Sequence, residues 1–393
     1  MKKVGLCFLF LFVVWGLSAE KMDKKLWEKA VKIAKSSIVF DLHEDVPSHM
    51  LSSDMSKDRE KGQSDLPKLI RGFVSAPVFA IYTPHSLDEK NPASHAIKEF
   101  KEVYKFVYRN KDKVEIAYTT KDLKRIFSEG KIAIVLSMEN CSPIKDEGYL
   151  YLYYRLGLRM AILTHMRSNR YADSSTDEEK WGGLSEEGKK MVQLMNKLGI
   201  VLDVSHLSDK AAMQVIKLSR APVIASHSGV RAINDVSRNL SDELIKAIAE
   251  KGGVIGVCFV PEFLDPEVNE NIKALRQEAR KLRKKYKDNR EAYQKAVKEL
   301  IASFKFKRTS IEKVVEHIKY IANLVGVDHV AIGSDFEGTF MTPKGLENVS
   351  KMPNLVYHLL KAGFSEKEIR KILGENFLRV WEKVEEVAKK LNK

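Results

Sequence analysis

The chain has 393 residues, 44% hydrophobic and 31% charged, a composition that excludes wholesale disorder and leaves room for one large domain or two of ordinary size. Its net charge of +14 permits nucleic-acid binding in principle, but basic and acidic residues are interleaved, above all over 269–316, and no nucleic-acid recognition motif is present. We therefore expect a solvated surface and no nucleic-acid partner.

The first nineteen residues carry the pattern of an export signal. Lys2 and Lys3 precede an apolar stretch over 4–17 that is short for a membrane span, and Leu17-Ser18-Ala19 offers a cleavage site. We expect 1–19 to be a signal peptide and 20–393 to be a single exported domain, periplasmic or secreted, with no membrane span. The alternative is that the segment remains as an N-terminal anchor.

Beyond this segment only two cysteines remain, Cys141 and Cys258. Two cysteines do not make a disulfide framework, and these two follow different apolar runs. We expect free and mostly buried thiols.

Apolar runs of strand length alternate with amphipathic helical stretches along the rest of the chain. The predicted strands are 37–43, 73–82, 131–139, 160–165, 200–206, 222–227, 253–259 and 329–335. The predicted helices are 24–35, 96–109, 149–157, 185–198, 208–219, 241–251, 311–325, 352–362 and 365–390. A highly charged helical segment, 266–304, is inserted before the eighth strand, and 47–65 reads as a long loop.

Eight strands that alternate with helices predict an α/β protein with a parallel sheet, and eight is the number that closes a (β/α)₈ TIM-like barrel. The rival is an open doubly wound sheet, but no glycine-rich phosphate loop follows the first strand. Active sites of such barrels lie at the carboxyl ends of the strands. We therefore look for chemistry at those ends.

Metal-binding residue types stand at or beside most of these strand ends. They are His43, Glu139, His165, His206, His227 and Asp335, with Asp45 two residues after His43. Strand alternation predicts that His206 and His227 point inward, together with Leu202 and Val204 and with Val223 and Ala225. Imidazoles mixed with carboxylates suit Zn²⁺ or a similar divalent ion. Three histidines and two acids are more ligands than one catalytic metal site needs. They fit two ions that share a bridging carboxylate, and such a pair of ions activates water as hydroxide.

Three of the polar residues have open roles at this point. His165 either stabilises charge on a substrate oxygen or is another ligand. Asp335 is either a general base and proton shuttle or a ligand. Arg238, just after the sixth strand, either holds a substrate carboxylate with its guanidinium fork or is a surface or structural residue.

The motifs, taken together, resemble the membrane dipeptidase (renal dipeptidase) family, peptidase family M19. The matching stretches are DLHED at 41–45, DLPKL at 65–69, SMEN at 137–140, LTH at 163–165, YADS at 171–174, LDVSHLSD at 202–209, PVIASHS at 222–228, SRN at 237–239 and IGSDFEG at 332–338. They follow the family order over nearly the whole chain after the signal segment.

The resemblance implies a zinc-dependent dipeptidase with two metal ions. His43 and Asp45 would bind one Zn²⁺ and His206 and His227 the other, with Glu139 bridging. His165 would polarise the scissile carbonyl, Arg238 would bind the substrate's terminal carboxylate, and Asp335 would transfer a proton and hold the substrate amine. Dipeptides, including those with a C-terminal D-residue, would be the substrates, and a homodimer stays open.

Two departures from the family pattern, Leu42 and Glu337, look peripheral, whereas the segment 266–304 is expected to affect substrate preference. One alternative function is another binuclear hydrolase of this barrel class, such as a lactonase, phosphotriesterase or deaminase. A second is an exported binding protein that is stabilised by its metal. The spare acid Asp335 argues against the second alternative, because a structural zinc site closes with four ligands.

Overall fold

The computed structural model describes residues 22–393, so the predicted signal peptide lies outside the described residues. The strands are β1 (Phe40–Glu44), β2 (Ala76–Tyr82), β3 (Val114–Ile116), β4 (Ile132–Glu139), β5 (Leu158–Ile162), β6 (Val201–Asp203), β7 (Val223–Ser228), β8 (Val254–Val257) and β9 (Val330–Ile332). The first helices are α1 (Lys24–Ser36), α2 (Val46–Met50), α3 (Leu66–Gly72), α4 (Pro92–Arg109), α5 (Thr120–Ser128), α6 (Glu147–Arg155), α7 (Glu186–Leu198), α8 (Asp209–Leu218) and α9 (Asp242–Glu250). They are followed by α10 (Pro261–Leu264), α11 (Pro266–Lys285), α12 (Arg290–Ser303), α13 (Ile311–Val325), α14 (Met352–Lys361), α15 (Glu366–Arg370) and α16 (Asn376–Leu391).

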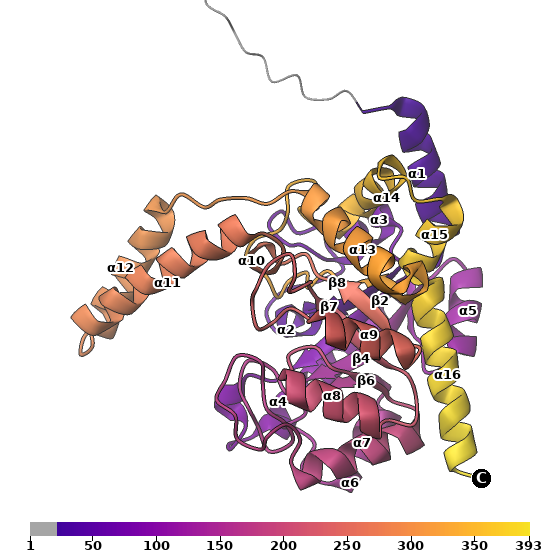
Figure 1. Ribbon diagram of the computed structural model, residues 1–393, viewed down its shortest axis with the longest axis horizontal. Helices are drawn as coiled ribbons and strands as arrows, with labels where there is room; N and C mark the ends of the chain where they lie inside the picture. Colours follow the sequence, from indigo (N-terminus) through magenta and orange to yellow (C-terminus); the bar gives the residue numbers. More distant parts are fainter. Residues whose placement is uncertain (1–21) are drawn as a thin grey trace, which may run out of the picture.

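Eight parallel strands form a nearly closed barrel, with helices around it (Figure 1). Their order is β1-β2-β4-β5-β6-β7-β8-β9. The two ends of this row meet where Glu44 pairs in parallel with Phe336 and where the Ser334 amide donates to the Asp41 carboxylate at 2.7 Å. The predicted (β/α)₈ class is therefore confirmed.

A ninth strand, β3, was not predicted from the sequence. It pairs with the beginning of β4, with Val114 opposite Ile132 and Ile116 opposite Ile134. Its three residues fall in a region with helical spacing on both sides, and three residues are too few to show a period of two. β3 lies off the main row and supplies no residue to the barrel rim.

Four strands end earlier than predicted: β8, which ends at Val257, and three strands that were expected to carry candidate residues at their ends. β5 ends at Ile162, β6 at Asp203 and β9 at Ile332, so His165, His206 and Asp335 lie in the loops that follow. At β6 the side chain of Asp203 accepts a hydrogen bond from the Ser205 amide at 2.9 Å, which turns the chain out of the strand.

Serine, aspartate and glycine residues cap several of the helices. Ser185 accepts from the Gly188 amide at 3.0 Å at the start of α7, and Gly199 ends that helix with φ +77°. Asp65, Ser208 and Ser241 cap α3, α8 and α9 in the same way. Cys141 and Cys258 are free and buried, as expected.

The amino end of the barrel is closed by the C-terminal helix. Phe377 of α16 lies edge-on to Phe40 of β1 with ring centroids 4.9 Å apart, and the fully buried Trp381 belongs to the same apolar cluster. This cluster contains the inward-facing strand residues, among them Val78 and Val135. The carboxyl end is therefore the open end of the barrel.

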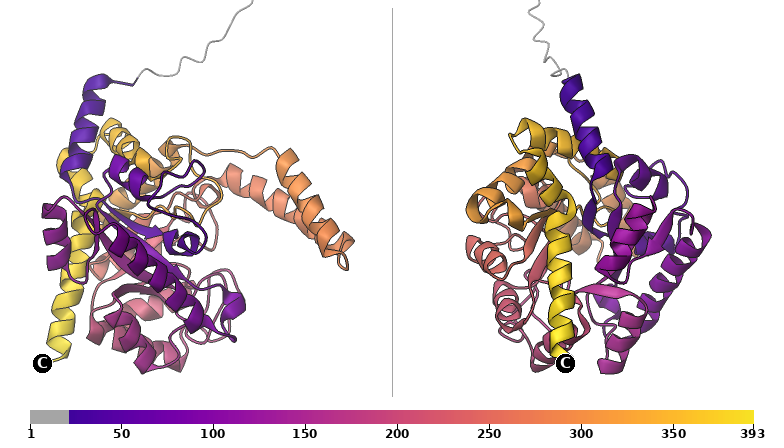
Figure 2. Two further views of the ribbon diagram at one scale, coloured as in Figure 1. Left: turned by 180° about the vertical axis from the view of Figure 1, so that it is seen from behind. Right: turned by 90° about the vertical axis from the view of Figure 1, so that its right-hand side faces the viewer.

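The segment 266–304 forms a helical hairpin, which we call the arm, made of α11 and α12. Figures 1 and 2 show it projecting from the barrel on the side away from α16. In the first turns of α11 the residues Val268, Asn269 and Ile272 are buried, whereas α12 has no buried residue. Within 22–393, no helix combines the length and apolar character that crossing a bilayer requires.

Candidate metal centre

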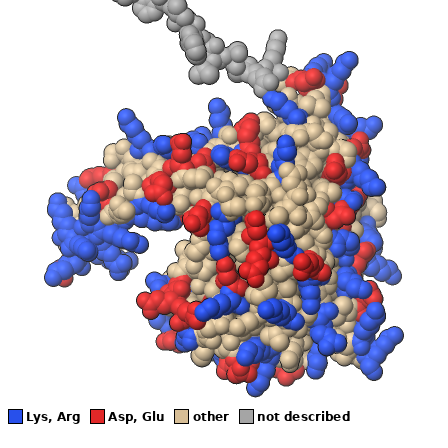
Figure 3. All heavy atoms as spheres, viewed as in Figure 1, with Lys and Arg blue, Asp and Glu red and all other residues tan. Residues whose placement is uncertain are grey.

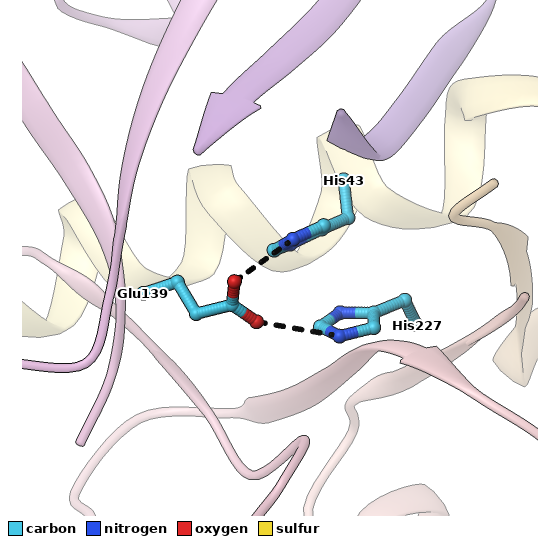
Figure 4. Close-up of side chains that lie close together, drawn as sticks. All are labelled: His43, Glu139 and His227. Carbon is cyan, nitrogen blue, oxygen red and sulfur yellow. Dashed lines mark ion pairs between the residues drawn. The ribbon is translucent and has the colours of Figure 1, made fainter. Parts of the chain in front are cut away.

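Glu139, the last residue of β4, lies at the centre of a buried cluster at the open end of the barrel. One carboxylate oxygen, Oε2, is 3.6 Å from His43 Nε2. The other, Oε1, is 3.0 Å from His206 Nε2 and 3.5 Å from His227 Nε2. Figure 4 shows His43 and His227 approaching the two oxygens from different strands. Glu139 is therefore placed between imidazoles on both of its oxygens.

His206, which follows β6, and His227, which lies on β7, are held close together. The Nε2 atoms of His206 and His227 are 2.9 Å apart, and His227 Nδ1 is 2.8 Å from the Ser226 hydroxyl. His206 has φ +68°, a conformation that L-residues adopt rarely and that aims its ring back toward Glu139. Hydrogen bonding of the far ring nitrogen orients an imidazole ligand.

The rings of His206 and His227 do reach the Glu139 cluster, but the face that strand alternation predicted them to share with their apolar neighbours is wrong. Leu202, Val223 and Ala225 pack in the core between the strands and the outer helices, so their face is the outer one. The pairing of β7 with β8 shifts register between Ala225 and Ser228, and such a bulge re-aims a side chain. Alternation holds for Glu139, which shares its face with the interior residue Val135.

Two further carboxylates lie beside His43. Asp45 Oδ2 is 3.7 Å from His43 Nε2, and Asp335 is close enough to both to form a third potential metal group. Gly338 makes this approach feasible, because a Cβ there would lie 2.1 Å from Asp45 Oδ2 and 2.3 Å from Asp335 Oδ1. Any larger residue would push the two carboxylates apart.

The cluster has the electrostatics of a site that is built around positive charge. Burial, together with the neighbouring Asp45, raises the pKa of Asp335 well above its usual range. Burial, together with Arg238, lowers the pKa values of His206 and His227 well below the usual value for histidine. Burial opposes ionisation of Glu139, yet the neighbouring His43 and the close approach of His206 Nε2 hold the pKa of Glu139 well below the usual value. The histidines after β6 and on β7 are thus neutral, the form in which imidazole binds metal.

The donor set fits metal ions. Buried atoms that lack a hydrogen-bond partner include both ring nitrogens of His43 and Oε1 of Glu139. Three overlapping groups within 22–393 bring their ligand atoms within 4.8 Å of one another. They are His43–Glu139–His227, Glu139–His165–His206 and His43–Asp45–Asp335. Clustered donors without partners at such spacing are what divalent ions require.

His165 and Arg238 flank the cluster. The ring centroids of His165 and His206 lie 4.4 Å apart. Burial lowers the pKa of His165, so the His165 ring is neutral. Arg238 is 4% exposed; its Nη2 donates to the His227 carbonyl at 2.9 Å, while its Nε has no partner. Arg238 is therefore not a surface residue.

A cavity of about 760 Å³ opens over the cluster. Its lining includes Glu139, His165, His206, Arg238 and Asp335. The arm contributes to the opposite wall through Asn269, Ile272, Lys273 and Arg276. These five candidate residues therefore face one space that is large enough for a small peptide, whereas His43 and His227 lie beneath its lining.

Tyr82 and Glu337 are among the residues of this cavity that sequence reasoning missed. Tyr82, the last residue of β2, places its ring edge-on to His165 with centroids 4.9 Å apart, and burial near Glu139 raises its pKa to about 12. Glu337, which we expected to be peripheral, lines the cavity and accepts hydrogen bonds from the Gln63 and Ser64 amides at 2.8 and 2.9 Å. Tyr82 pairs with Glu139 in the sheet register, which is a signal that only the fold reveals.

A (β/α)₈ barrel with a buried histidine–carboxylate cluster under its open end defines a metal-dependent hydrolase. The chain belongs to the membrane dipeptidase family, peptidase family M19, whose model matches residues 27–393. It is therefore a member of a family of metallodipeptidases, as the motifs had predicted.

Individual relatives agree with this assignment. Dipeptidase aclJ of Aspergillus oryzae is 31% identical over 344 residues, which span 85% of this chain and 73% of the relative. The probable dipeptidase PvdM of Pseudomonas aeruginosa has a similar structure, with a TM-score of 0.80 at 29% identity over 92% of this chain and 99% of that one. A metallopeptidase of Rhodobacter sphaeroides, solved with a phosphinate mimic of L-Ala-D-Ala, shares the fold with a TM-score of 0.74 at 24% identity, over 89% of this chain and 100% of that one.

Proposed function

We propose that the protein is a zinc-dependent dipeptidase with a binuclear centre, which hydrolyses dipeptides that include those with a C-terminal D-residue. The observation that carries the binuclear part is the position of Glu139. One of its oxygens faces His43 and the other faces His206 and His227. A carboxylate with imidazoles on both oxygens is suited to bridging two ions.

The proposed ligands divide into two sets that share Glu139. His43 and Asp45 hold one ion, and His206 and His227 hold the other. When bound, two such ions lower the pKa of a water molecule and polarise a carbonyl oxygen. Nitrogen and oxygen donors of this mixture suit Zn²⁺, which supports our choice of metal.

Arg238 gives the site its preference for a free carboxylate. Its buried guanidinium donates to the His227 carbonyl and leaves Nε without a partner. A carboxylate that accepts from this group would satisfy it and neutralise a charge buried next to the metal ligands. This favours a dipeptide, whose carboxylate lies one residue beyond the scissile bond, over a lactone or a phosphotriester.

His165 and Asp335 supply the remaining polar groups. The neutral His165 donates a hydrogen bond to the substrate carbonyl oxygen, on which negative charge develops. Burial raises the pKa of Asp335 above the usual range of a carboxyl group, which suits a group that takes a proton from the attacking water and passes it to the leaving amine. Tyr82 packs against His165 and fixes the orientation of its ring.

Tolerance of a D-residue is the finer part of the proposal. It is implied by the family resemblance, and the phosphinate mimic of L-Ala-D-Ala bound by the Rhodobacter sphaeroides metallopeptidase is a ligand of this kind. Comparing kcat/KM for Gly-D-Ala and Gly-L-Ala tests it directly. Failure to cleave Gly-D-Ala would remove this part and leave the dipeptidase intact.

The first experiment is metal analysis together with hydrolysis of Ala-Ala and Gly-D-Ala by wild type and His206→Ala. We expect nearly two zinc ions per chain and loss of hydrolysis with His206. Two metal ions without dipeptide cleavage would redirect the proposal to another substrate of the same barrel class. No bound metal after reconstitution would overturn it.

We also propose that the protein is exported through residues 1–19. The support is the sequence pattern of that segment. Cell fractionation and N-terminal sequencing of the purified protein test it: a chain that begins at Glu20 outside the cytoplasm supports export, and a cytoplasmic chain that begins at Met1 refutes it.

A further inference from the structure

The arm is a stiff projection with a well-anchored base. The α11 helix has 20 residues, so it extends about 30 Å at 1.5 Å per residue. At the base, Asn271 accepts from the Lys307 amide at 2.9 Å and Lys307 Nζ lies 2.8 Å from Glu267. These contacts tie the return of the chain to the start of α11.

The far end of the arm, which we call the arm tip (280–290), is strongly basic. It carries seven cationic side chains, Arg280, Lys281, Arg283, Lys284, Lys285, Lys287 and Arg290, and one acid, Asp288. All eight are exposed. Figure 3 shows the end of the arm covered in blue with little red, whereas both colours alternate over the barrel. The predicted interleaving of charges over 269–316 therefore fails at the tip.

Most of these cations have no acidic partner. Lys281 lies 2.6 Å from Glu278 and Lys287 lies 3.8 Å from Asp288. The other five, Arg280, Arg283, Lys284, Lys285 and Arg290, form no ion pair with any described residue. On the barrel, by contrast, Arg125 pairs with both Glu115 and Glu129.

Helix stability does not account for the cluster. Cations in the last turn of α11 interact favourably with the negative end of the helix dipole. Arg290, however, is the first residue of α12, where the positive end of the dipole disfavours a cation. Seven like charges within eleven residues also repel one another. An anionic partner would relieve both unfavourable effects.

We propose that the arm tip binds the surface of an anionic phospholipid membrane. Clusters of four to eight Lys and Arg residues bind such surfaces through the summed attraction of weak contacts. Tyr286, which lies between Lys285 and Lys287, is an amphipathic aromatic residue suited to the headgroup region.

The shape of the arm favours a membrane over nucleic acid. A helix that reads a DNA groove lies along it, with contacts spread over its length. Here the cations surround the end of a hairpin, while its shaft carries acids such as Glu267, Glu270 and Glu299. A convex basic end meets a flat anionic surface. The shaft, where Glu267 pairs with Lys307 and Glu270 with Lys273, offers no continuous basic stripe along which a phosphate backbone could lie.

Membrane binding would also orient the catalytic cavity. The same helix that carries the tip lines the cavity at its other end through Ile272 and Lys273. Binding at the tip would therefore hold the cavity about one arm length from the lipid surface, without a membrane-spanning segment.

The test is co-sedimentation of the chain from Glu20 onward with lipid vesicles at low and high salt. One set contains phosphatidylglycerol mixed with phosphatidylcholine, and the other contains phosphatidylcholine alone. The tip variant replaces the five unpaired cations by Gln: Arg280→Gln, Arg283→Gln, Lys284→Gln, Lys285→Gln and Arg290→Gln. The control variant makes the same charge change on the barrel helices and loops, with Lys111→Gln, Lys121→Gln, Lys217→Gln, Lys246→Gln and Lys389→Gln. All five lysines are exposed, and none forms an ion pair with a described residue.

We expect the wild type and the control variant to bind anionic vesicles at low salt and to be released by high salt, and the tip variant to bind at least about 100-fold more weakly. Both variants should keep the wild-type circular dichroism spectrum and dipeptide hydrolysis. Equal binding by the tip variant, equal loss in the control variant, or equal binding to phosphatidylcholine would overturn the proposal. Tighter binding to duplex DNA than to anionic vesicles at the same salt would assign the tip to nucleic acid instead.

Discussion

The two ends of the barrel are made by the same strands but hold opposite kinds of side chain. At the amino end, Phe40 and Val78 pack against Phe377 and Trp381 of α16 in a plug. Among these four residues, the only buried polar side-chain atom without a partner is Trp381 Nε1. At the carboxyl end, which we call the rim, the last residue of β4, Glu139, faces a group of buried imidazoles. The amino end gains stability mainly from apolar burial, whereas the carboxyl end gathers several buried polar groups that lack partners.

This difference separates stability from chemistry in space. Apolar burial at the plug contributes favourably to folding. The rim carries buried atoms without partners and residues at strained φ, such as His206 and Asp335, both of which cost folding free energy. Substitutions at the two ends should therefore affect different measurements, and the following predictions test that division.

The largest effect is expected for Glu139→Gln. Loss of the bridging charge should lower kcat for Ala-Ala on the order of 10³-fold or more and reduce bound metal, because both ion sites share this residue. Steady-state kinetics and metal analysis measure the two effects. The control is Glu385→Gln on α16, whose carboxylate accepts from the Thr120 amide at 2.9 Å, far from the cluster. Full activity in Glu139→Gln would contradict the assigned centre.

At the opposite end, Trp381→Ala should destabilise the fold without changing the chemistry. Removing a fully buried Trp side chain leaves a cavity and should reduce the free energy of unfolding by about 3–5 kcal/mol. Urea unfolding measures this loss, and kcat of the folded protein should stay near wild type. Trp27→Ala, a half-buried Trp on α1, is the matched control and should cost clearly less. A large fall in kcat with little loss of stability would break the division between the two ends.

The sequence predicts the plug and the rim unequally. Hydrophobic periodicity located all eight barrel strands, because apolar runs bounded by capping residues record burial directly. Glu139 also followed from alternation along a regular strand. His206 and His227 did not, because a positive φ and a register shift re-aim them, and neither leaves a periodic signal. Tyr82 was missed because only the pairing of β2 with β4 places it beside Glu139.

A smaller effect is expected at Arg238, where the rim recognises substrate. Arg238→Ala should lower kcat/KM for Ala-Ala about 10- to 100-fold, because a charge-assisted contact to the substrate carboxylate is lost. The wild type should discriminate strongly against Ala-Ala amide, and the variant should lose most of that discrimination. Arg231→Ala, which breaks a 2.6 Å ion pair with Asp209 outside the cluster, is the control and should keep the preference. If Arg238→Ala retained the wild-type ratio, carboxylate recognition would lie elsewhere.

The smallest effect concerns His317, a buried histidine outside the metal cluster that tests whether every buried imidazole here serves chemistry. His317 Nδ1 accepts from the Val230 amide at 3.0 Å, and Nε2 lies 3.0 Å from the Leu264 carbonyl oxygen, to which it donates. Burial lowers its pKa to about 4, with Glu316 and Lys313 as the charged neighbours. Both ring nitrogens of His317 form hydrogen bonds to the backbone. We therefore expect His317, like the plug, to contribute to stability and not to the chemistry.

Because the folded pKa of His317 lies below the unfolded value of about 6.5, the unfolded chain binds the proton more tightly between these values. Stability from this residue is therefore fully present above pH 6.5 and is lost as the pH falls toward 4. Between pH 7 and pH 5 the loss should be about 2 kcal/mol. His317→Gln, which can accept and donate in the same directions but does not titrate, should lose less stability over this interval, by about that amount, in paired urea unfolding experiments. Equal pH dependence in the two proteins would show that His317 is not held neutral, while unchanged kcat in the variant would place it on the structural side of the division.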